Sequence, residues 1–204
     1  TLIMIFAFFL NEAIYVSAFL LRNDPKAEWW NYYTQAYFIL SNVSLVLISV
    51  LSSSFLTAFS YFQEYWPWFL LIGIVFVGMG IRLFKGVLEK GIFLGLSRGW
   101  IDLATDGVYE IVRHPMYAGW ALFYFGLVLI LDSFLGLLFL PSFLLILYLK
   151  SILEERVILK KKIEKKYEQY EQETPYRLIG PPYNVILGII SIFIVYIGLI
   201  NFFT

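Results

Sequence analysis

The stretch "MYAGWALFYFGLVLILDSFLGLLFLPSFLLILYL", residues 116–149, contains a single charged side chain, Asp132. A helix crosses the hydrocarbon core of a bilayer with about 20 apolar residues, so this run is too long for one crossing and suits two. The break falls at "LDSFLG", residues 131–136, where a charge, a serine and a glycine favour a tight turn. The sequence therefore predicts a helical hairpin whose two open ends lie close together.

The rest of the chain has the same apolar character. Of its 204 residues 60% are hydrophobic and only 15% are charged, and the mean hydropathy is +0.77, which is far from a typical soluble domain. We predict an all-α, polytopic integral membrane protein that forms one membrane domain over residues 1–204. Its three parts would be an N-terminal three-helix part, a middle part with the chemistry, and a C-terminal transmembrane helix, at 1–84, 85–183 and 184–204. The charge-poor runs predict about six spans, at residues 1–21, 36–62, 66–84, 116–131, 134–156 and 184–203.

The distribution of charge predicts an orientation for these spans. All fifteen Lys and Arg residues fall in loops on one side, at residues 22–34, 82–115 and 150–183. The opposite loops carry only Glu64 and Asp132. By the positive-inside rule the basic loops face the cytoplasm, and both termini lie on the other side.

The composition excludes several kinds of site. The chain has no cysteine and one histidine, so disulfides, thiolate chemistry and a multi-histidine metal site are excluded, and we predict no metal. Its formal net charge is zero, and no basic patch interleaved with aromatic residues suggests nucleic acid. Nothing in the sequence indicates a protein partner.

A first candidate for chemistry is "GVYEIVRHPMYAGW", residues 107–120. Gly107 allows a tight turn and Pro115 suits the first turn of the following helix, so Arg113 and His114 are held at the mouth of that helix. In the alternative interpretation, Arg113 reaches to lipid phosphate and His114 only fills space at the interface.

A second candidate is the pair Glu154 and Glu155, at the end of the helix that returns from the hairpin. A tight hairpin brings these carboxylates to Arg113 and His114, so that opposite charges converge at the membrane edge. Alternatively, the helix leaves the bilayer and both glutamates pair with the lysines at 161–162.

The third candidate is "YEQYEQETPYR", residues 167–177. Tyr167 and Tyr170 share one helix face, and Tyr176 with Arg177 follows a proline that ends the helix. This amphipathic segment either closes over the pocket as a lid or lies at the interface with its tyrosines at headgroup depth. The preceding lysines favour contact with anionic lipid: Lys160, Lys161, Lys162, Lys165 and Lys166.

Two further features lie inside the predicted spans. Glu12 is an intramembrane carboxylate, which is either a functional group or is bonded to a neighbouring helix. Gly73, Gly78 and Gly80 indicate close packing of the helix at 66–84.

Together these motifs resemble a known family. The "RHP" stretch, the apolar hairpin, "EE" and the "YEQY" and "PYR" segment are similar to the isoprenylcysteine carboxyl methyltransferases and the related membrane phospholipid methyltransferases, over roughly residues 99–182. The resemblance implies an S-adenosylmethionine-dependent transferase with a cytoplasm-facing cofactor pocket and a lipid-linked acceptor that enters from the bilayer. The cofactor-binding residues that it implies are Asp102, Leu103, Ala104, Tyr109, Arg113, His114, Pro115, Tyr117, Glu154 and Glu155.

The resemblance also implies catalytic roles for Arg113, Lys150 and Glu155. In the carboxyl methyltransferases a basic residue one turn before the glutamate pair helps to hold the acceptor, and Lys150 stands there. The expected acceptor is therefore a lipid-linked carboxylate such as a prenylcysteine-type C-terminus. Alternatives are a phospholipid amine N-methyltransferase and an NADPH-dependent membrane sterol or lipid reductase, which shares the "RHP", "EE" and "PYR" pattern. Ile101 departs from the family, which often has histidine there. A conduit for ions or small molecules is disfavoured, because the spans are almost uniformly apolar.

Overall fold

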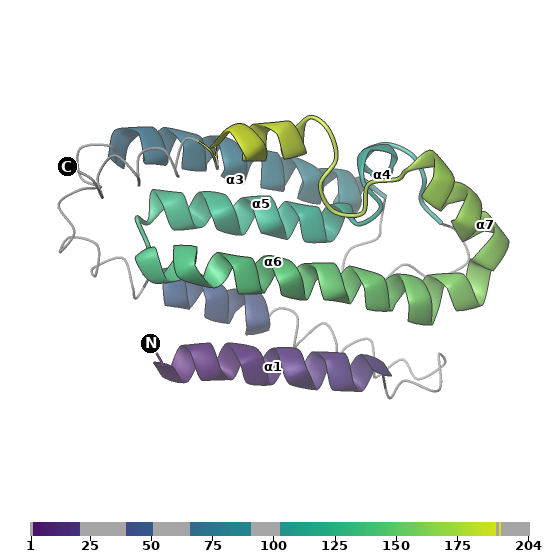
Figure 1. Cartoon of the computed structure of the whole chain (residues 1–204), viewed down its shortest axis with the longest axis horizontal. Coiled ribbons are helices and arrows are strands. Elements are labelled where there is room, and N and C mark those ends of the chain that lie inside the picture. Colours follow the sequence, from purple (N-terminus) through teal and green to yellow (C-terminus); the bar gives the residue numbers. More distant parts are fainter. Residues whose placement is uncertain (1, 21–39, 51–65, 91–102, 191, 193–204) are drawn as a thin grey trace.

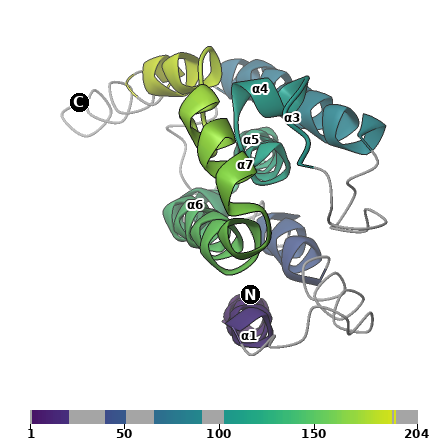
Figure 2. The same ribbon diagram turned by 90° about the vertical axis from the view of Figure 1, so that its right-hand side faces the viewer.

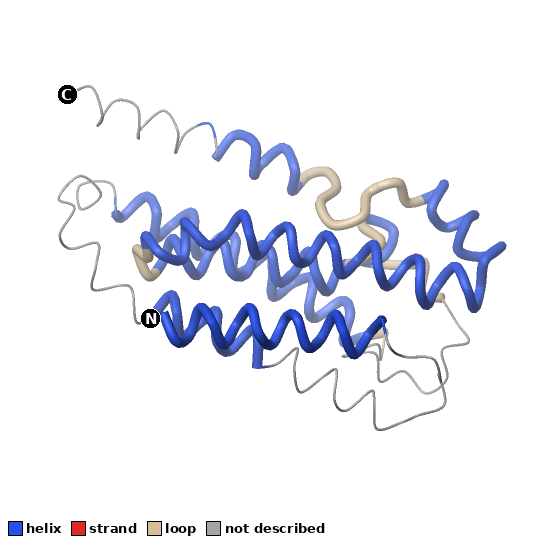
Figure 3. Tube along the Cα trace, turned by 60° about the horizontal axis from the view of Figure 1, so that its bottom comes forward, coloured by secondary structure: helices blue, strands red, loops and turns tan. Residues whose placement is uncertain are grey.

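The computed structural model describes residues 2–20, 40–50, 66–90, 103–190 and 192, and within these ranges the chain forms helices and turns without a strand (Figure 1, Figure 3). The prediction of an all-α protein is confirmed for this part of the chain. Its helices are α1 (Leu2–Leu20), Leu40–Val50, α3 (Trp66–Glu89), α4 (Val108–Ile111), α5 (Pro115–Ile130), α6 (Phe134–Glu154), the π-helical segment η4 (Glu155–Leu159), α7 (Lys160–Glu173) and a helix at 183–190.

The predicted hairpin is present, because only residues 131–133 join α5 to α6. Asp132 adopts a left-handed backbone conformation with φ of 51°, which a short polar residue tolerates in a turn. The hydroxyl of Ser133 then accepts a hydrogen bond from the N–H of Gly136 at 3.0 Å and caps α6. The open ends of the hairpin, at Pro115 and Glu154, consequently lie at the same end of the molecule.

Helix α5 lies at the centre of the bundle, which Figure 2 shows nearly end-on. One apolar cluster packs α1, Leu40–Val50 and α6 against α5, with Phe8, Leu45, Tyr124 and Leu147 among its buried members. A second cluster packs α3 and the helix at 183–190 against α5, with Phe76, Leu122 and Tyr183. Since α5 is covered on both sides, its first turn is a fixed point of the structure.

Glycines allow the backbones of α3 and α5 to come very close. A β-carbon at Gly73 would lie 2.7 Å from the carbonyl oxygen of Gly126, and one at Gly80 would lie 2.8 Å from that of Gly119. The predicted packing role is therefore confirmed for Gly73 and Gly80. It is wrong for Gly78, which has nothing within 4 Å of an added β-carbon, because this residue lies on the opposite face of α3.

Within the described residues, α3 is the one helix that is long and apolar enough to cross a membrane. It continues five residues beyond the predicted end at residue 84, so Arg82 and Lys85 belong to the helix and not to the following loop. Lys85 and Glu89 are exposed and lie 3.9 Å apart at helical i,i+4 spacing, which supports this extra turn in polar surroundings. α1, α5 and α6 coincide with predicted spans, whereas the spans at 36–62 and 184–203 lie partly outside the described residues.

The chain changes direction after α6. The π-helical turn Glu155–Leu159 and the non-helical φ/ψ of Ile163 (−139°, 38°) interrupt the regular helix. As a result α7 crosses the end of the bundle (Figure 1, Figure 2). Residues 174–182 then run back past the start of α5 to the helix at 183–190.

Candidate active site

The approach to the site begins with a capped turn before α4. Gly107 has φ of 67°, a left-handed conformation that favours glycine. Its N–H donates to Oε1 of Glu110 at 3.2 Å, and an ion pair between Lys90 and Asp106 ties the end of α3 to this turn. The tight turn that the sequence predicts at Gly107 is therefore present, and it leads directly into α4.

Two chain segments then lie side by side at the start of α5. The N–H groups of Arg113 and His114 donate to the carbonyl oxygens of Tyr176 and Arg177, each across 2.9 Å. His114 is the N-cap residue of α5. This pairing, together with the packed first turn of α5, holds the side chains of Arg113 and His114 at the mouth of the helix.

The carboxylate of Glu155 is the centre of the site. Arg113 donates from Nε to Oε1 of Glu155 across 3.0 Å, and Nε2 of His114 lies 3.1 Å from the same oxygen. Arg177 donates from Nη2 to Oε2 across 2.6 Å and from Nε to Oε1 across 3.0 Å. Because Glu155 is only 2% exposed, its charge needs such partners, and an unpaired buried carboxylate would be strongly destabilising.

Glu154 occupies the outer side of the same cluster. Its Oε2 lies 3.3 Å from Nδ1 of His114, and its side chain is 29% exposed. The predicted convergence of the two glutamates with Arg113 and His114 is thus confirmed. Arg113 is buried within the protein, so the alternative in which it reaches to lipid phosphate is wrong.

His114 lies between two carboxylates. Burial opposes its protonation, but the hydrogen bonds and charges of Glu154 and Glu155 outweigh burial, and the pKa of the imidazole is raised above its usual value. Both ring nitrogens lie within reach of a carboxylate oxygen, which suits the doubly protonated ring. The ring of Tyr117 stacks on the imidazole at 5.6 Å between centroids.

The end of α7 closes over Arg113. Nη1 of Arg113 donates to the carbonyl oxygens of Thr174 and Pro175 at 2.9 and 3.0 Å. Nη2 of Arg113 lies 3.5 Å from Oε1 of Glu171 on α7. One guanidinium therefore links α5, α6 and the segment after α7.

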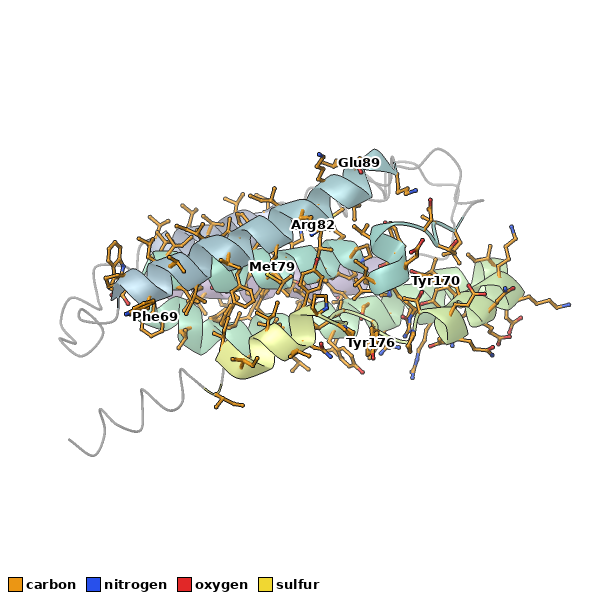
Figure 4. All side chains as sticks on the ribbon, turned by 90° about the horizontal axis from the view of Figure 1, so that it is seen from above. Phe69, Met79, Arg82, Glu89, Tyr170 and Tyr176 are labelled. Carbon is orange, nitrogen blue, oxygen red and sulfur yellow. The ribbon has the colours of Figure 1, made fainter. Side chains whose placement is uncertain are left out.

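The tyrosines of α7 face this cluster. Tyr167 and Tyr170 are 0% and 2% exposed, and the Tyr170 hydroxyl donates to the carbonyl oxygen of Tyr109 across 2.8 Å. Burial and the nearby Glu155 raise the pKa of the Tyr167 hydroxyl. Tyr167 and Tyr170 therefore pack against the protein, as the lid interpretation predicts, whereas Tyr176 is exposed (Figure 4). Their depth in the membrane stays a prediction.

Tyr109 itself lies half-buried on α4. Burial and the charge of Glu154 raise the pKa of its hydroxyl, so this group stays neutral and remains a hydrogen-bond donor. Its position next to α7 brings it to the edge of the cluster.

The other predicted cofactor residues differ in their positions. Pro115 and Tyr117 are buried in the first turn of α5, directly after His114. Leu103 and Ala104 are half-buried in the segment that precedes α4, and Asp102 lies outside the described residues. The binding role of Asp102, Leu103 and Ala104 stays a prediction.

Lys150 does not join the cluster. Its Nζ lies 2.9 Å from Oε1 and 2.7 Å from Oε2 of Glu12 on α1. Glu12 is therefore bonded to a neighbouring helix, one of the two expectations for this residue. The acceptor-binding role of Lys150 remains a prediction.

Two residues of the cluster, Arg177 and Glu171, are not predicted by the sequence motifs. Arg177 was expected only as part of a lid, yet it makes two hydrogen bonds to Glu155. Glu171 on α7 contacts both Arg113 and Lys160. The "PYR" motif was the one available signal for Arg177; nothing distinguished Glu171 from the other acidic residues of its helix.

The model of the phospholipid methyltransferase family matches residues 68–166, from α3 into α7. This stretch, just under half of the chain, is similar to that family. The resemblance inferred from the sequence motifs is thereby confirmed, and the matched residues include Arg113, His114, Lys150 and both glutamates of the cluster. No curated protein and no solved structure matches the chain. Among the residues that the structure describes, no group of three metal-ligating side chains occurs.

Proposed function

We propose that this protein transfers a methyl group from S-adenosylmethionine to a lipid-linked acceptor in the membrane. The observation that carries the proposal is the network of Arg113, His114, Arg177 and Glu155 at the open end of the hairpin. When bound, S-adenosylmethionine supplies an electrophilic methyl group on a sulfonium, and it also carries a carboxylate, an ammonium and ribose hydroxyls. Such a ligand needs both signs of charge next to aromatic faces, and the cluster offers both.

The exposure of the cluster fits a bound cofactor of this kind. The side chains of Arg113, His114 and Glu155 are at most 5% exposed, whereas Glu154 and Glu171 are 29% and 32% exposed. The inner side of the network is therefore buried, and its outer side, at Glu154 and Glu171, is accessible to a ligand. We assign Arg113 and His114 to the cofactor carboxylate, Glu154 to its ammonium or ribose, and Tyr109 and Tyr117 to its aromatic or sulfonium part.

Glu155 has a different part in this proposal. With three partners already bound, it holds Arg113 and His114 in orientation. Alignment of the reacting groups and exclusion of water are the principal means by which an enzyme accelerates such a displacement. Tyr167 and Tyr170 cover the cluster and keep water from its inner side.

The proposal includes a membrane topology. We propose about six spans, with the basic loops and the active site facing the cytoplasm and both termini on the opposite side. The support is that all fifteen Lys and Arg residues fall within residues 22–34, 82–115 and 150–183, which lie on one side in the six-span topology, together with the apolar helix α3. The catalytic part would then be residues 85–183.

The test is a calorimetric titration of the detergent-purified protein with S-adenosylhomocysteine and, in parallel, with NADPH. Saturable binding of S-adenosylhomocysteine alone is the expected result. Binding of NADPH alone would assign the protein to the lipid reductases, and the absence of binding in both titrations would contradict an enzymatic role for this cluster.

A further inference from the structure

One carboxylate at the edge of the site, that of Glu171 on α7, contacts two cations. Its Oε1 lies 3.5 Å from Nη2 of Arg113, and its Oε2 lies 2.8 Å from Nζ of Lys160 at the start of the same helix. The side chain of Arg113 is 5% exposed, whereas those of Glu171 and Lys160 are 32% and 40% exposed. Glu171 therefore covers the outer edge of a buried guanidinium and is itself bound by a second cation nearer to the solvent.

The rest of the Arg113 guanidinium is firmly bound. Its Nε donates to Glu155 across 3.0 Å, and its Nη1 donates to the carbonyl oxygens of Thr174 and Pro175 across 2.9 and 3.0 Å. Removal of the buried carboxylate of Glu155 would leave charge unpaired inside the protein, which is costly. The contact of Nη2 with Glu171 is longer than each of these, and its anion is partly exposed. Nη2 is therefore the position on Arg113 at which one carboxylate can replace another.

Such an exchange costs Glu171 little. When its carboxylate leaves Arg113 it keeps Lys160 as a partner, and a partly exposed ion pair contributes little to stability. An incoming carboxylate gains a buried guanidinium, which binds an anion more strongly than an exposed cation does. The two carboxylates compete, because two anions at the same nitrogen repel each other.

We propose that Glu171 holds the place of a ligand carboxylate on Arg113 and moves toward Lys160 when that ligand binds. This inference rests on the proposed function, in which the ligand is S-adenosylmethionine. Glu171 then lowers the affinity for the amino-acid part of the cofactor, because the apparent affinity falls with the fraction of molecules in which the position is free. Lys160 has the opposite effect, because it stabilises the displaced carboxylate. Both act through Arg113 and are in this sense positioning residues.

The experiment measures the Kd of two ligands for the detergent-purified protein by calorimetric titration. S-adenosylhomocysteine carries the carboxylate, whereas 5′-methylthioadenosine keeps the nucleoside and the thioether but lacks the amino-acid part. Glu171→Gln should bind S-adenosylhomocysteine about threefold to fivefold more tightly than the parent protein does, and 5′-methylthioadenosine with unchanged affinity. Glu168→Gln makes the same change of charge at an exposed position of α7, so it is the matched control and should change neither affinity.

A second variant gives a shift of opposite sign and keeps the inference testable if Glu171→Gln folds poorly. Lys160→Gln deprives the displaced carboxylate of its cation, so it should weaken the binding of S-adenosylhomocysteine about threefold. If Glu171 only fastened α7 over the site, its replacement would loosen the helix and weaken binding, as Tyr170→Phe should.

Three results would overturn the inference. They are unchanged or weaker binding of S-adenosylhomocysteine in Glu171→Gln, tighter binding of both ligands in that variant, and unchanged or tighter binding of S-adenosylhomocysteine in Lys160→Gln. If the parent protein binds S-adenosylhomocysteine, each of them contradicts the role of Glu171 alone. A parent protein that does not bind S-adenosylhomocysteine would contradict the proposed function and this inference with it.

Discussion

Arg113 donates from Nε to Oε1 of Glu155 across 3.0 Å, although 42 residues separate the two in the chain. Since Glu155 also accepts hydrogen bonds from Arg177 and contacts His114, one carboxylate connects the start of α5, the end of α6 and the segment after α7. The stability of this end of the bundle and the order of the candidate site should therefore depend on the same residue.

Replacement of Glu155 by glutamine tests this dependence. The variant leaves buried cations without their counterion, and we expect the free energy of unfolding to fall by about 3 kcal/mol. Glu154→Gln removes a partly exposed carboxylate that contacts His114, and it should cost less than about 1 kcal/mol. Thermal unfolding of both variants in detergent measures the difference. Equal losses would contradict the central position of Glu155.

His114 should make stability depend on pH. Its pKa in the folded protein is raised, so its contribution is fully present below the unfolded-state pKa of about 6.5 and is lost as the pH rises through the folded-state value. The difference in Tm between the parent protein and His114→Asn, which does not titrate, should therefore shrink as the pH is raised from near neutral into the alkaline range. A difference that grows with pH would show that the neutral imidazole is the stabilising form.

Close packing of α3 and α5 predicts a contrast between two glycines. A β-carbon at Gly126 would lie 2.5 Å from the carbonyl oxygen of Gly73, so Gly126→Ala should lower the free energy of unfolding by about 1 to 3 kcal/mol. Gly78→Ala, on the open face of α3, is the control and should have little effect or stabilise the helix slightly. The measurement compares the Tm values of Gly126→Ala and Gly78→Ala with that of the parent protein in the same detergent. A tolerated Gly126→Ala would contradict the close backbone contact.

The docking of α7 depends on a hydroxyl group. Tyr170→Phe removes the hydrogen bond to the carbonyl oxygen of Tyr109 and should cost about 1 kcal/mol. Cleavage by trypsin at the lysine-rich start of α7 should become faster than in the parent protein. Tyr176→Phe changes an exposed residue and serves as the matched control. Identical cleavage of both variants would mean that the Tyr170 bond does not hold α7 in position.

The hairpin and the charged cluster could be predicted because both follow from local signals. A short turn at residues 131–133 joins two apolar helices, so the residues that flank the hairpin must meet. Arg113 and His114 precede it, and Glu154 and Glu155 end it. Their types and spacing were sufficient to predict an ion-pair cluster, although not that Glu155 is the buried member and Glu154 the exposed one.

The burial of α7 was not predictable in the same way. An amphipathic helix with tyrosines on one face fits the surface of a membrane or the surface of a protein equally well. The choice depended on the direction of the chain after α6, which the π-helical turn and the backbone of Ile163 determine. Tyr167 and Tyr170 were consequently assigned to a face without knowledge of what that face contacts.

The sequence by itself determined the helical class, the apolar hairpin and the residues that meet at its open end, because these depend on hydropathy and on contacts across one short turn. Only the tertiary structure decided that Lys150 is paired with Glu12, that Arg177 completes the shell of Glu155 and that α7 covers Arg113. Each of these contacts joins elements whose relative placement depends on the packing of the whole bundle. A local sequence pattern does not determine which buried carboxylate pairs with a cation that is distant in the chain.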